Sequence, residues 1–264
     1  MTRIISVVNQ KGGVGKTTTA VNMATALAAI GKKVLIIDLD PQGNASTGLG
    51  IDQAQRQYTS YDVLVGACTL EQASLKTAIP RLFVAPATID LSGAEIELVN
   101  MENREYQLRS ALRDMPALWD YAIIDCPPSL GLLTINALTA SDAVLIPLQC
   151  EFYALEGLSH LLKTIRLIQT KLNPKISIHG VVLTMYDRRN KLTEQIEQDV
   201  RAFLGKDVYE TVIPRNVRIS EAPSHGKPAL VYDLKCPGSQ AYLRLAKELI
   251  QREKAFTSPT PKAA

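Results

Sequence analysis

Short apolar runs alternate along this chain with longer segments in which apolar residues recur every three or four positions. The short runs are rich in Val, Ile and Leu and predict buried strands at residues 4–8, 33–38, 82–87, 121–125, 142–147, 176–185 and 208–212. The longer segments predict helices at residues 19–30, 91–115, 130–140, 155–171, 193–204 and 238–252, with a short one beginning at 61–64. This alternation predicts an α/β fold: one domain built on a doubly wound, mostly parallel sheet of at least seven strands flanked by helices.

Length and composition fit that expectation. The 264 residues are 46% hydrophobic, which is enough for one sizeable core. We expect a domain over residues 1–254 and a flexible, proline-containing C-terminal tail over residues 255–264. The sequence has no uninterrupted apolar stretch of about 18 residues, so no membrane-spanning helix is expected. The four cysteines are scattered without C-x-x-C pairing, as is typical of reduced thiols in a cytoplasmic protein.

Charge is distributed unevenly along the chain. Residues 1–174 carry 14 Lys and Arg against 16 Asp and Glu, whereas residues 175–264 carry 15 against 10. The net charge of +3 is therefore the sum of −2 and +5, and the basic part is the last third. A basic segment of this kind indicates a polyanionic partner.

A glycine-rich stretch, KGGVGKTT, lies between the first predicted strand and the first predicted helix. Its glycines, which let the backbone turn and approach a phosphate closely, are Gly12, Gly13 and Gly15. Backbone amides of such a turn and the positive end of the helix dipole form an anion site. We expect Lys16 to reach the β- and γ-phosphates of a nucleotide and the Thr17 hydroxyl to bind Mg²⁺. The simpler interpretation is a Gly-Lys turn at the start of a helix.

Two predicted strands end in acidic residues. Asp38 ends the run at 33–38 and is followed by Asp40, while Asp125 ends the run at 121–125. Because the carboxyl ends of parallel strands meet at one edge of a sheet, these carboxylates should face the phosphate region. Asp125 is expected to hold Mg²⁺ as a Walker B carboxylate, with Asp38 as a further residue of the metal site. For Asp40 a competing interpretation is a cap of the next turn.

The glycine-rich loop departs from the usual P-loop pattern. Gln10 stands where Gly is usual, and an additional lysine, Lys11, opens the loop. In this respect the stretch resembles the deviant Walker A box of the ParA/MinD/nitrogenase-iron-protein ATPases. The resemblance implies that Lys11 reaches across the interface of a homodimer to the phosphates of the partner's nucleotide, with Lys16 acting within its own subunit. The implied nucleotide-binding residues of the loop are Lys11, Gly12, Gly13, Val14, Gly15, Lys16, Thr17 and Thr18, and the implied cofactors are ATP and Mg²⁺.

A second stretch narrows the resemblance. The sequence IPRNVRISEAPSHGKP at residues 213–228 resembles the signature that separates chromosome-partitioning ParA/Soj proteins from the rest of the superfamily. The resemblance implies that Asp40 positions the water that attacks ATP and that Glu151 contacts the ribose of the opposite subunit. The residues implied to line the adenine pocket or to lie next to it are Met185, Pro214, Arg215 and Asn216.

Arginines gather in the loops that follow two predicted strands. They are Arg188, Arg189, Arg215 and Arg218. Guanidinium groups on loops suit phosphate contacts that do not depend on base sequence, and the chain lacks a helix-turn-helix or zinc-finger pattern that would read bases. The alternative is that loop arginines are merely solvated. The resemblance implies non-specific binding of double-stranded DNA by the ATP-bound dimer, and hydrolysis stimulated by a ParB-type centromere-binding protein, in the cytoplasm on the nucleoid.

Three other functions share parts of this pattern. A MinD-like membrane-cycling ATPase, which positions cell division, requires a C-terminal amphipathic helix, and the ending TSPTPKAA does not predict one. An iron–sulfur reductase requires cysteines paired at a dimer axis, and Cys126 has no evident counterpart. An amide-ligating synthetase would share the P-loop but not the stretch at 213–228. We therefore expect an ATP-driven DNA-segregation switch without membrane attachment.

Overall fold

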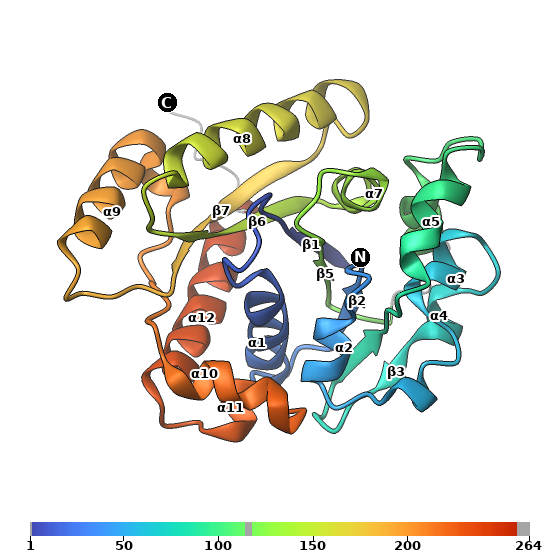
Figure 1. Cartoon of the computed structure of the whole chain (residues 1–264), viewed down its shortest axis with the longest axis horizontal. Helices are drawn as coiled ribbons and strands as arrows, with labels where there is room; N and C mark the ends of the chain where they lie inside the picture. Colours follow the sequence, from blue (N-terminus) through green and yellow to red (C-terminus); the bar gives the residue numbers. More distant parts are fainter. Residues whose placement is uncertain (1, 114–117, 258–264) are drawn as a thin grey trace, which may run out of the picture.

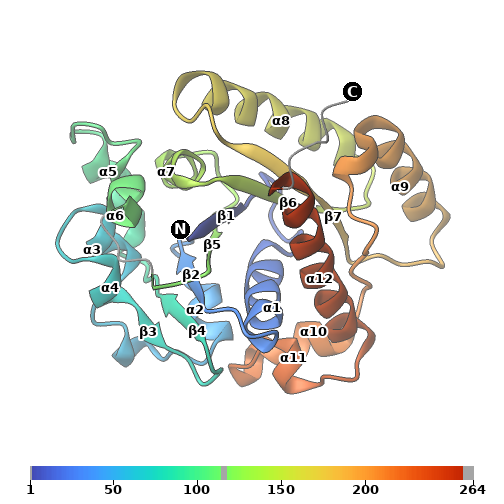
Figure 2. The ribbon, with the colours of Figure 1, turned by 180° about the vertical axis from the view of Figure 1, so that it is seen from behind.

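A single seven-stranded sheet forms the centre of the protein (Figures 1 and 2). The computed structural model describes residues 2–113 and 118–257. The strands lie in the order β3-β4-β2-β5-β1-β6-β7, and all neighbours are parallel except β3, which runs antiparallel to β4. Their bounds are β1 (Arg3–Val7), β2 (Val34–Asp38), β3 (Leu75–Lys76), β4 (Leu82–Ala85), β5 (Tyr121–Asp125), β6 (Ala143–Gln149) and β7 (Ser177–Thr184). The expected doubly wound, mostly parallel sheet is confirmed.

Helices cover both faces of this sheet. Their bounds are α1 (Lys16–Ala29), α2 (Asn44–Gly48), α3 (Ser60–Leu64), α4 (Leu70–Ala73), α5 (Leu91–Leu98), α6 (Gln107–Arg113), α7 (Leu132–Ala140), α8 (Ala154–Lys171), α9 (Lys191–Leu204), α10 (Val217–Glu221), α11 (Ala229–Tyr232) and α12 (Pro237–Thr257). Short 3₁₀ turns are η1 (Gln53–Gln55), η2 (Gly205–Asp207) and η3 (Ala222–His225). Figures 1 and 2 show α1 and α12 on one face and α7 and α8 on the other.

The alternation of side chains along each strand explains the two layers. In β2, Leu35 and Ile37 pack in the core under α7 and α8, whereas Val34 and Ile36 pack in the core under α1 and α12. All four are fully buried. A parallel strand covered on both faces has no polar side to show, and this is why the strands appear in the sequence as continuous apolar runs.

The prediction of a strand at residues 208–212 is wrong. Only Val208 forms a bridge, with Val181 of β7. Side chains of α12 occupy the backbone groups that a strand ladder would use: Arg252 donates to the carbonyl of Val208 at 2.8 Å, and Glu248 accepts from the amides of Glu210 and Thr211 at 2.9 and 3.0 Å. The seventh strand is instead β3 at the opposite edge, which is two residues long and leaves no apolar run in the sequence.

Two helices differ from expectation at their ends. The segment predicted as one helix at 91–115 is divided into α5 and α6, and Asn103 between them has a left-handed φ of 53°. Residue 115 lies outside the described residues. Helix α12 runs to Thr257, which includes the first three residues of the expected tail, and residues 258–264 lie outside the described part. No helix within the described ranges combines the length and apolar character needed to cross a lipid bilayer.

Candidate nucleotide site

The glycine-rich loop joins β1 to α1 at the carboxyl edge of the sheet. Gly13 and Gly15 have left-handed φ values of 75° and 88°, which a side chain would strain, and Gly15 is the residue immediately before α1. Two side chains hold the loop: Asn9 donates to the carbonyl of Pro147 at 2.7 Å, and Thr184 donates to the carbonyl of Val14 at 2.8 Å. The free amides of the first helical turn therefore open onto a fixed concavity that suits an anion.

Lys16 lies inside this concavity. The residue is buried, and its ammonium group donates to the carbonyl of Lys11 at 3.0 Å. Burial lowers the pKa of Lys16, and the nearby carboxylates of Asp125 and Asp40 act in the opposite direction. The expected phosphate lysine and two of the expected carboxylates thus converge on one place.

Asp38 and Asp125 lie side by side at the ends of β2 and β5, where they are register partners. Both are fully buried. Burial raises the pKa of Asp38 to about 6 despite hydrogen bonds from Ser46, and burial together with the charge of Asp38 raises the pKa of Asp125 well above its ordinary value. The Thr17 hydroxyl is near enough to favour the charged form of Asp125, but neither oxygen of that carboxylate accepts a hydrogen bond from the described residues.

Two buried carboxylates in contact, one without hydrogen-bond partners, fit a bound cation. Among the described residues no group of three or more His, Cys, Asp or Glu side chains is placed to hold a metal on its own. Mg²⁺ bound with a nucleotide needs fewer, because phosphate and water oxygens complete its octahedron. The oxygen donors of Asp38, Asp125 and Thr17 match that smaller protein set.

Ser46 is a residue of this site that the sequence interpretation missed. Its hydroxyl and its amide donate to Asp38 at 2.7 and 2.9 Å, and the hydroxyl accepts from the amide of Ala87 at 3.1 Å. Ser46 lies in α2, eight positions after Asp38, so its contact requires the turn at Gly43 with a φ of 62°. No sequence motif indicates the contact between Ser46 and Asp38; the turn at Gly43 is the feature that could have suggested it.

Asp40 is buried and begins the turn into α2. Its carboxylate accepts from the amide of Gln42 at 3.0 Å, and its carbonyl accepts from the amide of Gly43 at 2.8 Å. The residue that precedes α2 is Gly43 rather than Asp40. Asp40 therefore caps the turn before the helix and at the same time faces Lys16.

Lys11 and Glu151 form an ion pair with one another at the rim of the site. The Lys11 side chain is 49% exposed and that of Glu151 43%. Glu151 follows the end of β6, and backbone bonds from its amide to Gln149 at 2.9 Å and from Ala154 to its carbonyl at 2.8 Å hold the turn in place. Both residues for which the resemblance implies contacts with an opposite subunit thus lie together on an open surface.

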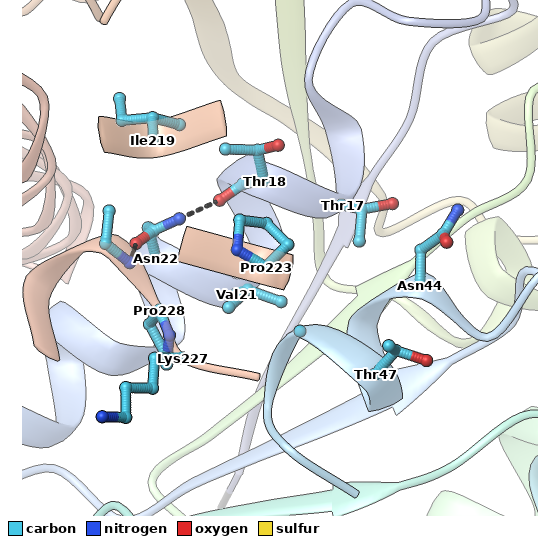
Figure 3. A pocket seen from close by; sticks show the side chains of 12 residues that line it. Thr17, Thr18, Val21, Asn22, Asn44, Thr47, Ile219, Pro223, Lys227 and Pro228 are labelled. Carbon is cyan, nitrogen blue, oxygen red and sulfur yellow. Dashed lines mark hydrogen bonds between the residues drawn. The ribbon is translucent and has the colours of Figure 1, made fainter. Parts of the chain in front are cut away.

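A cavity of about 260 Å³ lies beside the first two turns of α1 (Figure 3). Its walls come from α1, from α2 and from the segment around η3, which contribute Thr17 and Thr18, Asn44, and Pro223 and Lys227 respectively. Asn22 of α1 donates to the carbonyl of Thr18 one turn earlier at 2.8 Å, and it accepts from the amide of Ala229, the residue after the 213–228 segment, at 2.8 Å (Figure 3). The segment at 213–228 is therefore attached to the helix that follows the glycine-rich loop.

The residues assigned to the adenine surroundings also lie near the loop. Met185 has a left-handed φ of 49°, and its side chain lies against Gly15. The amide of Arg215 donates to the carbonyl of Tyr186 at 3.1 Å, which brings Pro214 beside the end of β7. Asn216 caps α10 by accepting from the amide of Arg218 at 3.0 Å.

The four arginines assigned to DNA are all exposed, but two are paired with acids. Arg189 forms two bonds of 2.9 Å with Asp187. Arg218 contacts Glu221 at 3.0 Å and Asp233 at 3.7 Å. The remaining two are Arg215 and Arg188.

Arg188 lies in an open groove of about 430 Å³ whose lining also includes Arg244 and Lys247 of α12 and the acids Glu210 and Glu248. The sequence interpretation did not assign Arg244 and Lys247. The two residues are three positions apart on a helix and therefore lie on one face. This spacing is the sequence signal that could have indicated a shared basic surface.

Comparison with known proteins identifies the family. A family described as an AAA domain matches residues 2–178. The chromosome partitioning protein ParA of Caulobacter vibrioides is 61% identical over 254 residues, which cover 96% of this chain and 95% of that protein. The sporulation initiation inhibitor protein Soj of Bacillus subtilis is 57% identical over 249 residues, 94% of this chain and 98% of that protein. The chain belongs to the ParA/Soj family of chromosome-partitioning ATPases.

A solved structure supports the same fold. The cobyrinic acid a,c-diamide synthase from Mycobacterium smegmatis, with bound ADP and magnesium, superposes with a TM-score of 0.85 at 37% identity, and the match covers 100% of both chains. The fold resemblance stated from the glycine-rich loop is thus confirmed for the whole chain.

Proposed function

We propose that this chain is an ATP-driven DNA-segregation switch. ATP and Mg²⁺ bind at the glycine-rich loop, two loaded subunits form a dimer, and the dimer binds double-stranded DNA without sequence preference. Hydrolysis, stimulated by a ParB-type centromere-binding protein, then releases it. The cytoplasmic, nucleoid-associated location follows from DNA binding.

The observation that carries the proposal is the division between two lysines. Lys16 is buried beside Asp125, where it can neutralise phosphate charge within its own subunit. Lys11 lies half exposed at the rim, where its ammonium group pairs with the Glu151 carboxylate of the same chain. A lysine on an open face can serve a nucleotide in a facing subunit, and this makes the nucleotide part of the dimer interface.

The remaining site residues have distinct tasks in this proposal. Thr17, Asp38 and Asp125 would hold Mg²⁺, which when bound supplies positive charge to the β- and γ-phosphate oxygens. Asp40 orients the attacking water, a role that needs position more than basicity because phosphoryl transfer passes through a loose transition state. Since Lys11 of the partner completes the site only in the dimer, a lone subunit hydrolyses ATP slowly.

DNA binding rests on the basic last third. Arg218 and Arg215 lie in or next to α10, and the nearby segment at η3 forms a wall of the cavity beside α1. Each subunit offers few cations, so a monomer makes few phosphate contacts and binds weakly. Doubling them on a dimer raises the effective affinity steeply and makes it dependent on ATP.

Two other functions have less support. A membrane-cycling switch would place an amphipathic helix on lipid, but the apolar face of α12, including Tyr242, Leu245 and Leu249, is buried in the core. An amide-forming synthase is the activity named for one structural neighbour at 37% identity. The chromosome-partitioning relatives match at 57–61% over nearly the same length, and we favour their function.

The test is retention on DNA at two salt concentrations with ATP or ADP, using an Asp40→Ala background to slow hydrolysis. We expect binding that requires ATP, weakens with salt and is reduced at least about tenfold by Arg218→Glu. The matched control is Arg166→Glu, an exposed arginine of α8 on the other face of the sheet, which should leave retention unchanged. An ATP-dependent dimer that ignores DNA of any sequence would refute the DNA-segregation function.

A further inference from the structure

Two aromatic side chains stand exposed at the rim of the nucleotide site. Phe152 and Tyr153 are 77% and 67% exposed, and their rings contact each other edge to face, with centroids 5.0 Å apart and an interplanar angle of 86°. They connect the end of β6 to the start of α8 (Figure 1). Neighbouring large aromatic rings in water are a feature of binding surfaces rather than of an inert loop.

The backbone holds this pair in a fixed position. Tyr153 immediately precedes α8, and its carbonyl accepts from the amide of Gly157 at 3.1 Å. On the other side, Cys150 is buried and fixes the start of the turn. An aromatic side chain has few rotatable bonds and therefore loses little conformational entropy when it binds, which makes it an efficient contact.

The position of the pair indicates what covers it. Glu151, the residue before Phe152, forms the ion pair with Lys11, so the aromatic rings and the rim lysine share one surface. This surface carries a cation, an anion and an apolar pair next to one another. Such a patch is self-complementary when a second copy is rotated by 180° about an axis through it.

We propose that Phe152 and Tyr153 are the apolar anchor of the contact between two copies of this chain. The proposal rests on the ATP-dependent dimer proposed above and adds the residues that supply its binding energy. The aromatic pair is buried only when nucleotide brings the two Lys11-bearing faces together. The dimer therefore combines a charged contact at the phosphates with an apolar contact beside it.

The experiment measures mass by sedimentation velocity with Mg²⁺ and a slowly hydrolysed ATP analogue. We expect Phe152→Ala/Tyr153→Ala to raise the dissociation constant of the dimer at least about 30-fold, because truncating a central aromatic pair removes a large share of binding energy. Binding of a fluorescent ADP by the monomer should stay unchanged. The matched control is Phe203→Ala, which removes a ring that is 60% exposed on α9 and should leave the dissociation constant unchanged.

A second variant reports burial directly. The sequence contains one tryptophan, Trp119, which is 5% exposed. In Phe152→Trp, we expect the emission of the new indole to shift to shorter wavelength with Mg²⁺ and the ATP analogue but not with ADP.

The outcomes separate the two proposals. A wild-type chain that stays monomeric with the ATP analogue overturns the ATP dimer and the anchor together. A wild-type dimer matched by an equally stable dimer of the double variant, with no emission shift, overturns the anchor alone. Loss of co-sedimentation with vesicles of 1:1 phosphatidylglycerol and phosphatidylcholine in the double variant, with dimerisation intact, would instead assign the pair to lipid.

Discussion

At the scale of single residues, a side chain that suits the function of the site can destabilise the fold. Asp125 is fully buried without a hydrogen-bond partner among the described residues, beside a second buried carboxylate. Without a metal ion, burial and the second carboxylate outweigh the attraction of Lys16, so Asp125 destabilises the fold and takes up a proton. A bound metal would reverse this, since it favours the charged form of both carboxylates.

We therefore expect Asp125→Asn to raise the free energy of unfolding of the nucleotide-free protein by about 1–3 kcal/mol at pH 7.5. The raised pKa of Asp125 means that the folded state binds more protons than the unfolded state above the ordinary value of 3.8. Wild-type stability thus falls as pH rises through that window, and the gain from Asn should shrink toward pH 4. Urea unfolding between pH 4 and 8 measures this gain.

The same variant should lose Mg²⁺-dependent nucleotide affinity by at least about tenfold. Asp199→Asn, at an exposed position of α9, provides the matched control and should change neither quantity. A destabilised Asp125→Asn protein would show that the carboxylate has a favourable partner in the folded state.

The ion pair of Lys11 and Glu151 illustrates the opposite case. Both side chains are nearly half exposed, and pairs of this kind contribute about 0–1 kcal/mol. Breaking this ion pair therefore costs less free energy than a contact between Lys11 and a phosphate would contribute. The pair can hold the lysine in place without hindering its exchange to a partner's nucleotide.

At the scale of elements, the nucleotide side and the basic side meet at a contact between two glycines. Gly50, after α2, packs backbone to backbone against Gly226, after η3: a Cβ on Gly226 would lie 3.0 Å from the Cα of Gly50. Their φ values are 75° and 60°. Because α2 carries Ser46 and η3 follows α10 with Arg218, this contact joins the segment that holds Asp38 to the basic segment.

Gly226→Ala should lower the free energy of unfolding by about 2–4 kcal/mol, since both the left-handed φ and a rigid backbone neighbour oppose a side chain. Gly66→Ala isolates the first effect: its φ of 75° is left-handed, like the 60° of Gly226, but a Cβ there meets nothing within 4 Å. That control should cost only about 1–2 kcal/mol. Equal losses in the two variants, measured by urea unfolding, would mean that the glycine contact adds nothing.

At the scale of the whole molecule, one carboxylate joins α12 to the starts of three strands. Glu253 accepts from Arg3 of β1 at 2.7 Å and from Tyr121 of β5 at 3.0 Å, and lies 3.6 Å from His179 of β7. His179 is buried, and its Nδ1 lies 2.6 Å from the hydroxyl oxygen of Tyr209, so it is a packed residue of the core. This network lies at the opposite edge of the sheet from the nucleotide site.

Glu253→Gln should reduce the free energy of unfolding by about 1–3 kcal/mol at pH 7, a range discounted for the partial exposure of this carboxylate. Burial acts to raise the pKa of Glu253, but the neighbouring His179 side chain and the ion pair with Arg3 lower it to about 2. Its stabilisation is therefore complete above the ordinary value of 4.5 and is lost as pH falls through about 2.

The difference between wild type and Glu253→Gln should accordingly narrow from pH 5 to pH 2.5 in denaturant titrations. Glu194→Gln, at an exposed position of α9, is the control for removing an acid without removing a network. A difference that is constant across this pH range would contradict the titration of Glu253.

The sequence alone determined the elements and motifs that depend on local order. Apolar runs predicted six of the seven strands because parallel strands are buried on both faces. The glycine-rich loop identified the phosphate site because the residues that form it follow one another in the sequence. The carboxylates at strand ends followed from the same topology. The 213–228 stretch gave the family because it, too, is continuous in sequence.

Only the tertiary structure decided what depends on residues far apart. Ser46 reaches Asp38 through a turn, and α12 occupies the backbone groups that would have made residues 208–212 a strand. The Lys11–Glu151 pair spans 140 positions, and the contact of Gly50 with Gly226 has no pattern in the sequence. Local periodicity reports which face of an element is buried, whereas the partner of that face is chosen by packing across the whole chain.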